Sequence, residues 1–103
     1  MTVTPKALVA SKTIENTMTD QYTAVNLRAI IEAVTVTNIT ATAAVLNVEI
    51  DGVSHIKDRT VQAAQTLALN ALSGHVLEPN SVLSMSSGTA SALTTRVSGV
   101  EVT

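Results

Sequence analysis

The centre of the chain alternates between apolar and polar residues. In residues 42–50 every second residue is apolar and would share one face of a strand: Ala44, Leu46, Val48 and Ile50. A period of two is typical of a half-buried antiparallel strand. Asp51-Gly52 follows at once, and the alternation resumes in residues 53–57. Because aspartate tolerates positive φ and glycine adopts it freely, this pair predicts a β-hairpin with a type I′ turn.

Residues 28–38 predict a second long strand. One face is expected to carry Ile30, Val34 and Val36, and the other Ile31, Ala33, Thr35 and Thr37. Valine and threonine, which are both β-branched, are abundant throughout the chain and favour strands over helices. Further strands are predicted at residues 7–14, 21–24, 82–86 and 92–102, with Gly99 as a candidate β-bulge.

Two stretches need separate treatment. Residues 61–72 fit a helical stripe and a strand equally well by period, and we favour a loop that leads into a strand. Residues 74–77 approach a turn at Glu78-Pro79-Asn80, where proline is expected to lie outside any central strand because it cannot donate to a ladder.

These segments predict an all-β protein, an antiparallel β-sandwich of about seven to nine short strands with turn signals roughly every 8–12 residues. A chain of 103 residues has room for one domain, which we place at residues 7–103. Residues 1–6 show no packing pattern and are expected to form an N-terminal arm, either frayed or exchanged with a neighbouring copy.

Composition narrows the possible functions. The formal charge is −2 and Tyr22 is the only aromatic residue, which argues against nucleic-acid binding because such proteins use basic faces or stacking rings.

No run approaches the roughly 20 apolar residues that span a membrane, and no signal peptide is expected. A core without large rings or disulfides is expected to be thin, which favours an oligomer in which subunit contacts bury further apolar surface.

The sequence contains no recognisable catalytic, metal-binding or phosphate-binding motif. His55 and His75 stand alone rather than at the spacing of metal ligands, there is no Cys, and no serine lies in a Gly-x-Ser-x-Gly motif. Only four glycines occur, and none forms a phosphate-binding loop. We therefore predict a protein that is not an enzyme, with no cofactor, no metal and no small-molecule substrate. The tripeptide Asn38-Ile39-Thr40 matches a glycosylation motif, which we attribute to chance in a threonine-rich chain.

Two groups of residues are candidates for partner binding. Lys57, Asp58 and Arg59 form a charged group that is either a solvated loop or a docking loop in which Arg59 pairs with a partner carboxylate. The second group is the predicted arm, with Thr2, Val3, Thr4, Pro5 and Lys6.

Several stretches together resemble small structural proteins of tailed bacteriophages. These are Tyr22-Thr23, residues 28–38 (RAIIEAVTVTN), residues 74–83 (GHVLEPNSVL) and residues 97–102 (VSGVEV). The resemblance covers most of the chain from about Leu8 onward.

The resemblance implies a jelly-roll-like β-sandwich and, within that group, a capsid decoration (cement) protein. Such a protein would be made in the host cytoplasm and bind the capsid surface of the virion as a homodimer or homotrimer. There it would contact the phage major capsid protein and stabilise its lattice, and the family has no catalytic residues to carry over. The alternative is a tail, neck or head/tail-fibre component, and a carbohydrate-binding sandwich is a weaker hypothesis because it needs exposed rings.

Overall fold

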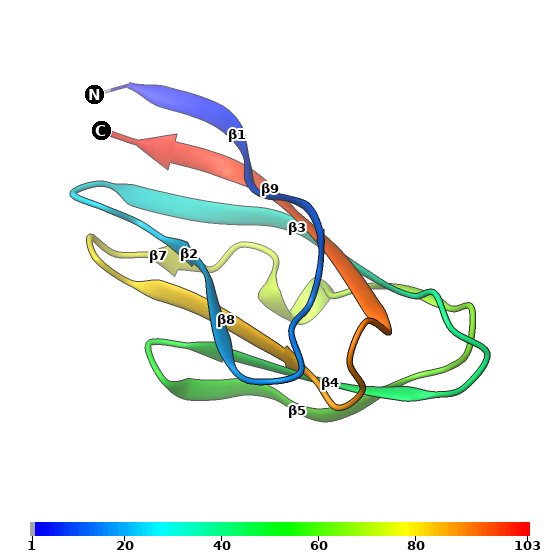
Figure 1. The fold of residues 1–103 in the computed structure, drawn as a ribbon. Helices are drawn as coiled ribbons and strands as arrows, with labels where there is room; N and C mark the ends of the chain where they lie inside the picture. The colour runs from blue at the N-terminus through cyan, green and yellow to red at the C-terminus, as the bar shows by residue number, and fades with distance from the viewer. Residues whose placement is uncertain (1) are drawn as a thin grey trace.

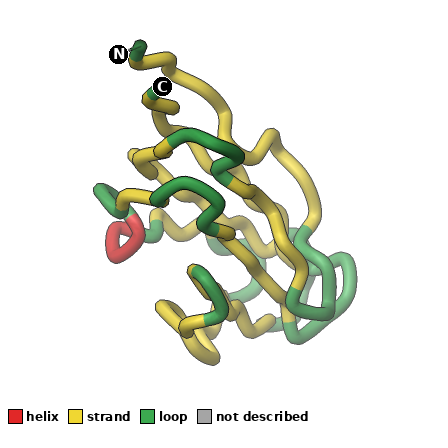
Figure 2. Tube along the Cα trace, turned by 90° about the vertical axis from the view of Figure 1, so that its left-hand side faces the viewer, coloured by secondary structure: helices red, strands yellow, loops and turns green. Residues whose placement is uncertain are grey.

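The computed structural model describes residues 2–103, and it consists of two antiparallel sheets packed face to face (Figures 1 and 2). The first sheet has the order β1 (Val3–Thr13), β9 (Leu93–Val102), β3 (Arg28–Asn38) and β6 (Thr66–Ala68), with β7 (Val76–Leu77) also paired to β3. The second has the order β2 (Thr19–Thr23), β8 (Val82–Ser87), β4 (Ala44–Ile50) and β5 (Val53–Val61). One 3₁₀ turn, η1 (Asn70–Leu72), lies between β6 and β7. The predicted β-sandwich is confirmed.

The strand pairing follows a jelly roll. β1 pairs with β9, β2 with β8, β3 with β6 and β7, and β4 with β5. These pairs follow one another along a single long antiparallel hairpin whose tip is the β4–β5 turn. Rolling this hairpin places β9 beside β3 and β8 beside β4, which creates the two sheets. The N- and C-terminal strands consequently lie side by side in Figure 1.

The tip of this hairpin has the predicted turn. Asp51 has φ 54° and Gly52 has φ 76°, the positive values that a type I′ turn requires. The Asp51 carboxylate also accepts hydrogen bonds from the backbone N–H of Val82 (2.9 Å) and the hydroxyl of Ser81 (3.0 Å). The turn is thereby attached to the start of β8.

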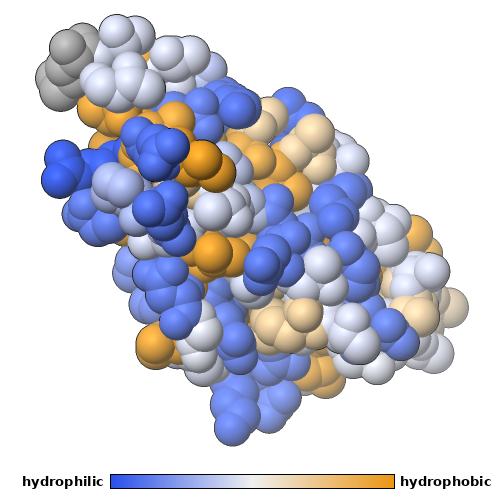
Figure 3. Space-filling model, turned by 60° about the vertical axis from the view of Figure 1, so that its left-hand side comes forward, coloured by the Kyte–Doolittle hydropathy of each residue, from blue (hydrophilic) through white to orange (hydrophobic). Residues whose placement is uncertain are grey.

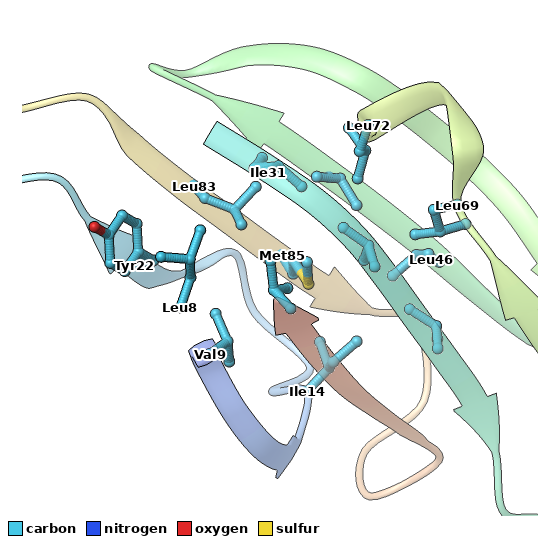
Figure 4. Packing of buried hydrophobic residues seen from close by; sticks show 14 of the residues in the cluster. Leu8, Val9, Ile14, Tyr22, Ile31, Leu46, Leu69, Leu72, Leu83 and Met85 are labelled. Carbon is cyan, nitrogen blue, oxygen red and sulfur yellow. The ribbon is translucent and has the colours of Figure 1, made fainter. Parts of the chain in front are cut away.

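Aliphatic side chains from both sheets fill the space between them, as Figure 4 shows for Leu8, Ile31, Leu46 and Leu83. Tyr22 contributes the only aromatic ring. The accessible surface is 5313 Å², close to the roughly 5,500 Å² expected for a folded monomer of this mass. The chain alone thus leaves about as much surface exposed as an ordinary folded monomer, with a core that is aliphatic except for Tyr22.

A β-bulge changes the faces of β3 from those predicted. The pairing with β9 shifts between Ile31 and Ala33, so that one extra residue enters β3 at this point. The extra residue reverses the alternation. Ile31 therefore lies in the core with Val34 and Val36, whereas Ile30 faces outward and is half-buried. The predicted grouping of Ile30 with Val34 and Val36 was wrong for this reason.

The predicted boundary between an arm and a domain does not hold. β1 begins at Val3, and residues 3–6 pair in register with β9 of the same chain instead of fraying or leaving for a neighbour. Thr2 continues this pairing through two backbone hydrogen bonds to Thr103 (3.0 and 2.9 Å). Met1, which the predicted arm included, lies outside the described residues.

Residues 61–72 form the end of β5, a loop, the short strand β6 and η1. The preference for a loop leading into a strand is confirmed, and the continuous helical stripe is absent from this segment. Leu69 and Leu72 carry the segment's contribution to the core. Within residues 2–103 we find no helix with the length and apolar character needed to cross a lipid bilayer.

Asn38 is a buried polar residue at the end of β3 whose side chain is fully hydrogen bonded. Its amide NH₂ donates to the carbonyl oxygens of Thr42 (2.8 Å) and Val61 (3.0 Å). Its Oδ1 accepts from the backbone N–H (2.9 Å) and the hydroxyl (2.7 Å) of Thr40. The asparagine of the glycosylation motif thus ties the crossing from β3 to β4 against the end of β5 inside the fold.

Gly99 is required where three strands approach closely. A Cβ at this position would overlap the carbonyl oxygen of Ile30 on β3 and lie 2.9 Å from Leu8 Cδ1 on β1. We predict that Gly99→Ala lowers the free energy of unfolding by about 3 kcal/mol, at the upper end of overpacking costs, because backbone must move to admit the methyl group. Urea unfolding measures this value.

The neighbouring Ser98→Ala is the matched control. Ser98 is half-exposed on the same strand, and we expect its replacement to change stability by no more than about 0.5 kcal/mol. Equal stabilities for the two variants would contradict the close approach at Gly99.

Candidate interaction surfaces

The two predicted groups of contact residues lie at different edges of the sandwich. Residues 3–6 belong to β1, the edge strand of the first sheet, and Lys57, Asp58 and Arg59 belong to β5, the edge strand of the second. Figure 1 shows β1 at the top of the molecule and β5 at the bottom. The structure does not bring the two groups together, and each belongs to a separate surface.

Residues of the predicted arm alternate between the two faces of the first sheet. Thr4 pairs with Glu101, which contacts Tyr22 of the opposite sheet, so this register position faces inward. Val3 and Pro5 therefore face outward, where Pro5 lies beside Val100.

This outward face carries an apolar row that crosses four strands. Val100 pairs with Ile30, which pairs with Val76, and Val3 lies beside Val102 in the adjacent register. We call these six residues the apolar row: Val3, Pro5, Ile30, Val76, Val100 and Val102. Figure 3 shows hydrophobic atoms gathered towards the upper end of the view, the end at which β1 begins.

The apolar row remains accessible to solvent. Val3 is 53% exposed and Val76 is 49% exposed, while Ile30, Val100 and Val102 are half-buried. Arg28 flanks the row beside Val102 and pairs with Glu78 at 2.7 Å. The residues of β3, β7 and β9 in the row were not among the predicted contact residues. The contribution of β9 is indicated by the alternation of Val100 and Val102 with Glu101, which places the two valines on one face of the strand.

Below this face, Glu101 joins the two sheets. Its Oε2 accepts a hydrogen bond from the Tyr22 hydroxyl (2.6 Å) and lies 3.4 Å from Lys6 Nζ. Burial, followed by the hydrogen bond and the negative charge of Glu101, raises the pKa of Tyr22 far above its ordinary value. The only tyrosine in the chain is therefore held in its neutral form at this end of the core.

Lys57, Asp58 and Arg59 are exposed as predicted, but they lie within the strand β5, so the loop assumed in both predictions, solvated or docking, is wrong. The pairing with β4 continues on both sides of the group, at Ile56 and at Thr60, so the strand does not end there. Asp58 has φ 52°, and its N–H donates to Asn47 Oδ1 at 2.8 Å. This positive φ accompanies a bulge that accommodates an extra residue in β5.

A hollow of about 470 Å³ opens between β5 and the segment that contains β6 and η1. We call it the β5 hollow, and its lining residues are His55, Ile56, Lys57, Arg59, Ala68, Leu69, Asn70 and Ala71. The His55 ring packs edge-on against the His75 ring, with centroids 5.2 Å apart. A His75 ring nitrogen lies 3.0 Å from the Ala71 carbonyl oxygen, which connects β5 to η1 through the two rings.

Among residues 2–103 no group of three His, Cys, Asp or Glu side chains could hold a metal ion. A second, smaller hollow of about 210 Å³ is lined by hydroxyl groups and one cation: Ser11, Thr35, Thr37, Thr94, Thr95 and Arg96.

Comparison with protein families, with curated proteins and with solved structures finds no match to this chain.

The inward cluster of Tyr22 and Glu101 predicts a stability loss at high pH. Folding raises the pKa of Tyr22, so the neutral side chain contributes fully to the free energy of unfolding below pH 10.0, its ordinary pKa. Above that pH the contribution is lost progressively, because the tyrosine of the unfolded chain ionises first. Tyr22→Phe should remove this loss, and it should also lower stability at neutral pH by about 1–2 kcal/mol through the missing hydrogen bond.

Urea midpoints of both proteins between about pH 7 and pH 11 measure this difference. The two stabilities should converge as the pH rises above 10, because only the wild-type protein loses the tyrosine contribution. Curves that stay parallel over this range would contradict the account of Tyr22.

Proposed function

We propose that the protein is a non-enzymatic structural component of a phage virion, a capsid decoration protein that binds the outer surface of the capsid as an oligomer. The observation that carries the proposal is the apolar row, because contiguous exposed apolar surface on a small protein marks a contact site. The jelly-roll strand order and the resemblance to phage structural proteins support this choice among contact functions.

Self-association through the apolar row is the first part of the proposal. The row is apolar at its centre with charges at its border, so two copies can meet there without burying an unpaired charge. Association through the edge of β1 is disfavoured, because Pro5 and Lys6 lie on that strand and its pairing with β9 is bulged. The contact therefore uses the face of the first sheet.

Binding to the capsid is the second part. A protein that binds only the assembled lattice of major capsid protein stabilises that lattice by mass action. An oligomer that contacts several capsid subunits at once gains further affinity through avidity, even where each contact is weak. Such a role needs contact surfaces and a stable scaffold, and it needs no catalytic residue.

The alternative is a tail, neck or head/tail-fibre component. It uses the same fold and the same mode of self-association, and it differs in where the oligomer binds and in how many copies each particle carries.

Substitutions in the apolar row should abolish self-association without unfolding the protein. We predict that Val3→Lys and Val76→Lys, at the two ends of the row, each weaken the oligomer at least roughly tenfold, because a lysine buried in the contact would be desolvated without a partner. The matched control is Val53→Lys, at the tip of the β4–β5 hairpin, where the valine is 62% exposed. Sedimentation equilibrium at micromolar concentrations measures the association, and an unchanged constant in both row variants would contradict the proposed contact.

Capsid binding is tested directly with phage particles stripped of their decoration protein. Cryo-EM of particles incubated with excess protein should show density repeated over the whole lattice, and the particles should resist heat better than bare ones. Density confined to one vertex or to the tail would support the alternative instead. Absence of any bound protein on capsids and tails would refute both forms of the proposal.

A further inference from the structure

We propose that the β5 hollow binds an acidic side chain of an extended protein segment, held by Arg59 and Lys57. The inference rests on the proposed function, since the segment would belong to the capsid protein. It goes further by naming the site and the chemical class of the group that enters it.

The first support is the pairing of the chain's cations. Lys6, Lys12 and Arg28 each form a salt bridge to a carboxylate, and Arg96 donates to the Ser11 hydroxyl. Lys57 and Arg59 form neither a salt bridge nor a side-chain hydrogen bond within residues 2–103, and both line the same hollow. The cations without an internal partner are thus the two that converge on one concave surface.

The second support is the absence of an acid from the lining of that hollow. Asp58 lies between Lys57 and Arg59 in sequence, yet it does not line the hollow. The local charge is therefore positive in a chain whose net charge is −2, which favours an anionic ligand at this place.

The shape of the hollow favours a side chain presented by an extended backbone. β5 ends the order of its sheet, so the backbone groups along its outer edge have no strand partner among residues 2–103. An incoming segment can pair with this edge, and its side chains then alternate into and away from the hollow. Asp58 limits such pairing to a few residues, since a bulge interrupts the edge.

The lining of the hollow suits glutamate or aspartate. Ile56 and Leu69 supply apolar contacts for the methylene groups, and the Arg59 guanidinium can bind both oxygens of a carboxylate. A volume of about 470 Å³ leaves room for a side chain and its flanking residues. Phosphate would satisfy the same cations, but nucleic acid is the weaker choice because the lining contains no ring other than His55 on which a base could stack.

The inference is tested with the short peptide acetyl-Ser-Val-Glu-Val-Ser-amide, added to ¹⁵N-labelled protein and followed by NMR. The expected result is a saturable change in the amide signals of residues 55–59 and 68–71. The same peptide with Gln in place of Glu should bind roughly tenfold more weakly, because it lacks the charge that Arg59 and Lys57 recognise.

Variants of the protein locate the site. Arg59→Gln should weaken binding of the Glu peptide roughly tenfold, and Arg59→Lys should restore only part of the loss because lysine cannot form the paired hydrogen bonds. The matched control is Arg96→Gln, an exposed arginine on β9 outside the hollow, which should leave binding unchanged. Equal binding of the Glu and Gln peptides, or of wild type and Arg59→Gln, would overturn the inference. Tighter binding of an oligothymidylate than of the Glu peptide would overturn it as well.

A capsid-binding experiment with the same variants distinguishes a failure of this inference from a failure of the proposed function. If wild type and Arg59→Gln decorate stripped capsids equally well, the proposed function stands and the β5 hollow is not its contact site. If wild type binds the Glu peptide at the hollow but binds no phage particle, the site stands and the capsid role fails.

Discussion

The close approach of β9 to β1 and β3 at Gly99 is the constraint on which the rest of the structure depends. The missing side chain at Gly99 leaves room for the Ile30 carbonyl and for Leu8, so all three strands join in one sheet. On the inner side of β9, Val97 and Leu93 enter an aliphatic core, and on the outer side Val100 and Val102 belong to the apolar row. A single strand therefore connects the stability of the sandwich with its proposed contact face.

Local patterns predicted those parts of the fold that depend on neighbouring residues. The alternation in β4 is confirmed, with Ala44, Leu46 and Val48 buried, and the Asp51-Gly52 turn has the expected backbone conformation. The predicted bulge at Gly99 on β9 was wrong, because the extra residues lie in its two partner strands, β1 and β3. Their positions depend on how strands distant in sequence fit together, which a local pattern does not record. The placement of residues 3–6 was missed for the same reason, since their partner is the last strand of the chain.

The candidate sites were harder to predict from the sequence than the fold was. Val3, Pro5, Lys57 and Arg59 were among the predicted contact residues, and the structure places them in the apolar row and the β5 hollow. Their companions come from segments far away in sequence: Val76 and Val100 in the row, and Asn70 and Ala71 in the hollow. The two surfaces use different chemistry, apolar contact in one and positive charge in the other, so an oligomer formed through the row would leave the β5 hollow free for a separate partner.

The central claim is that copies of the chain meet through the outer face of the first sheet. Because the protein has no cysteine, single-cysteine variants can test it with no background, using a long flexible bis-maleimide cross-linker. The account predicts covalent dimers from Val76→Cys, whatever the size of the oligomer, because each chain carries a single thiol, and only monomers from Val53→Cys under the same conditions. Cross-linking from Val53→Cys with none from Val76→Cys would contradict it.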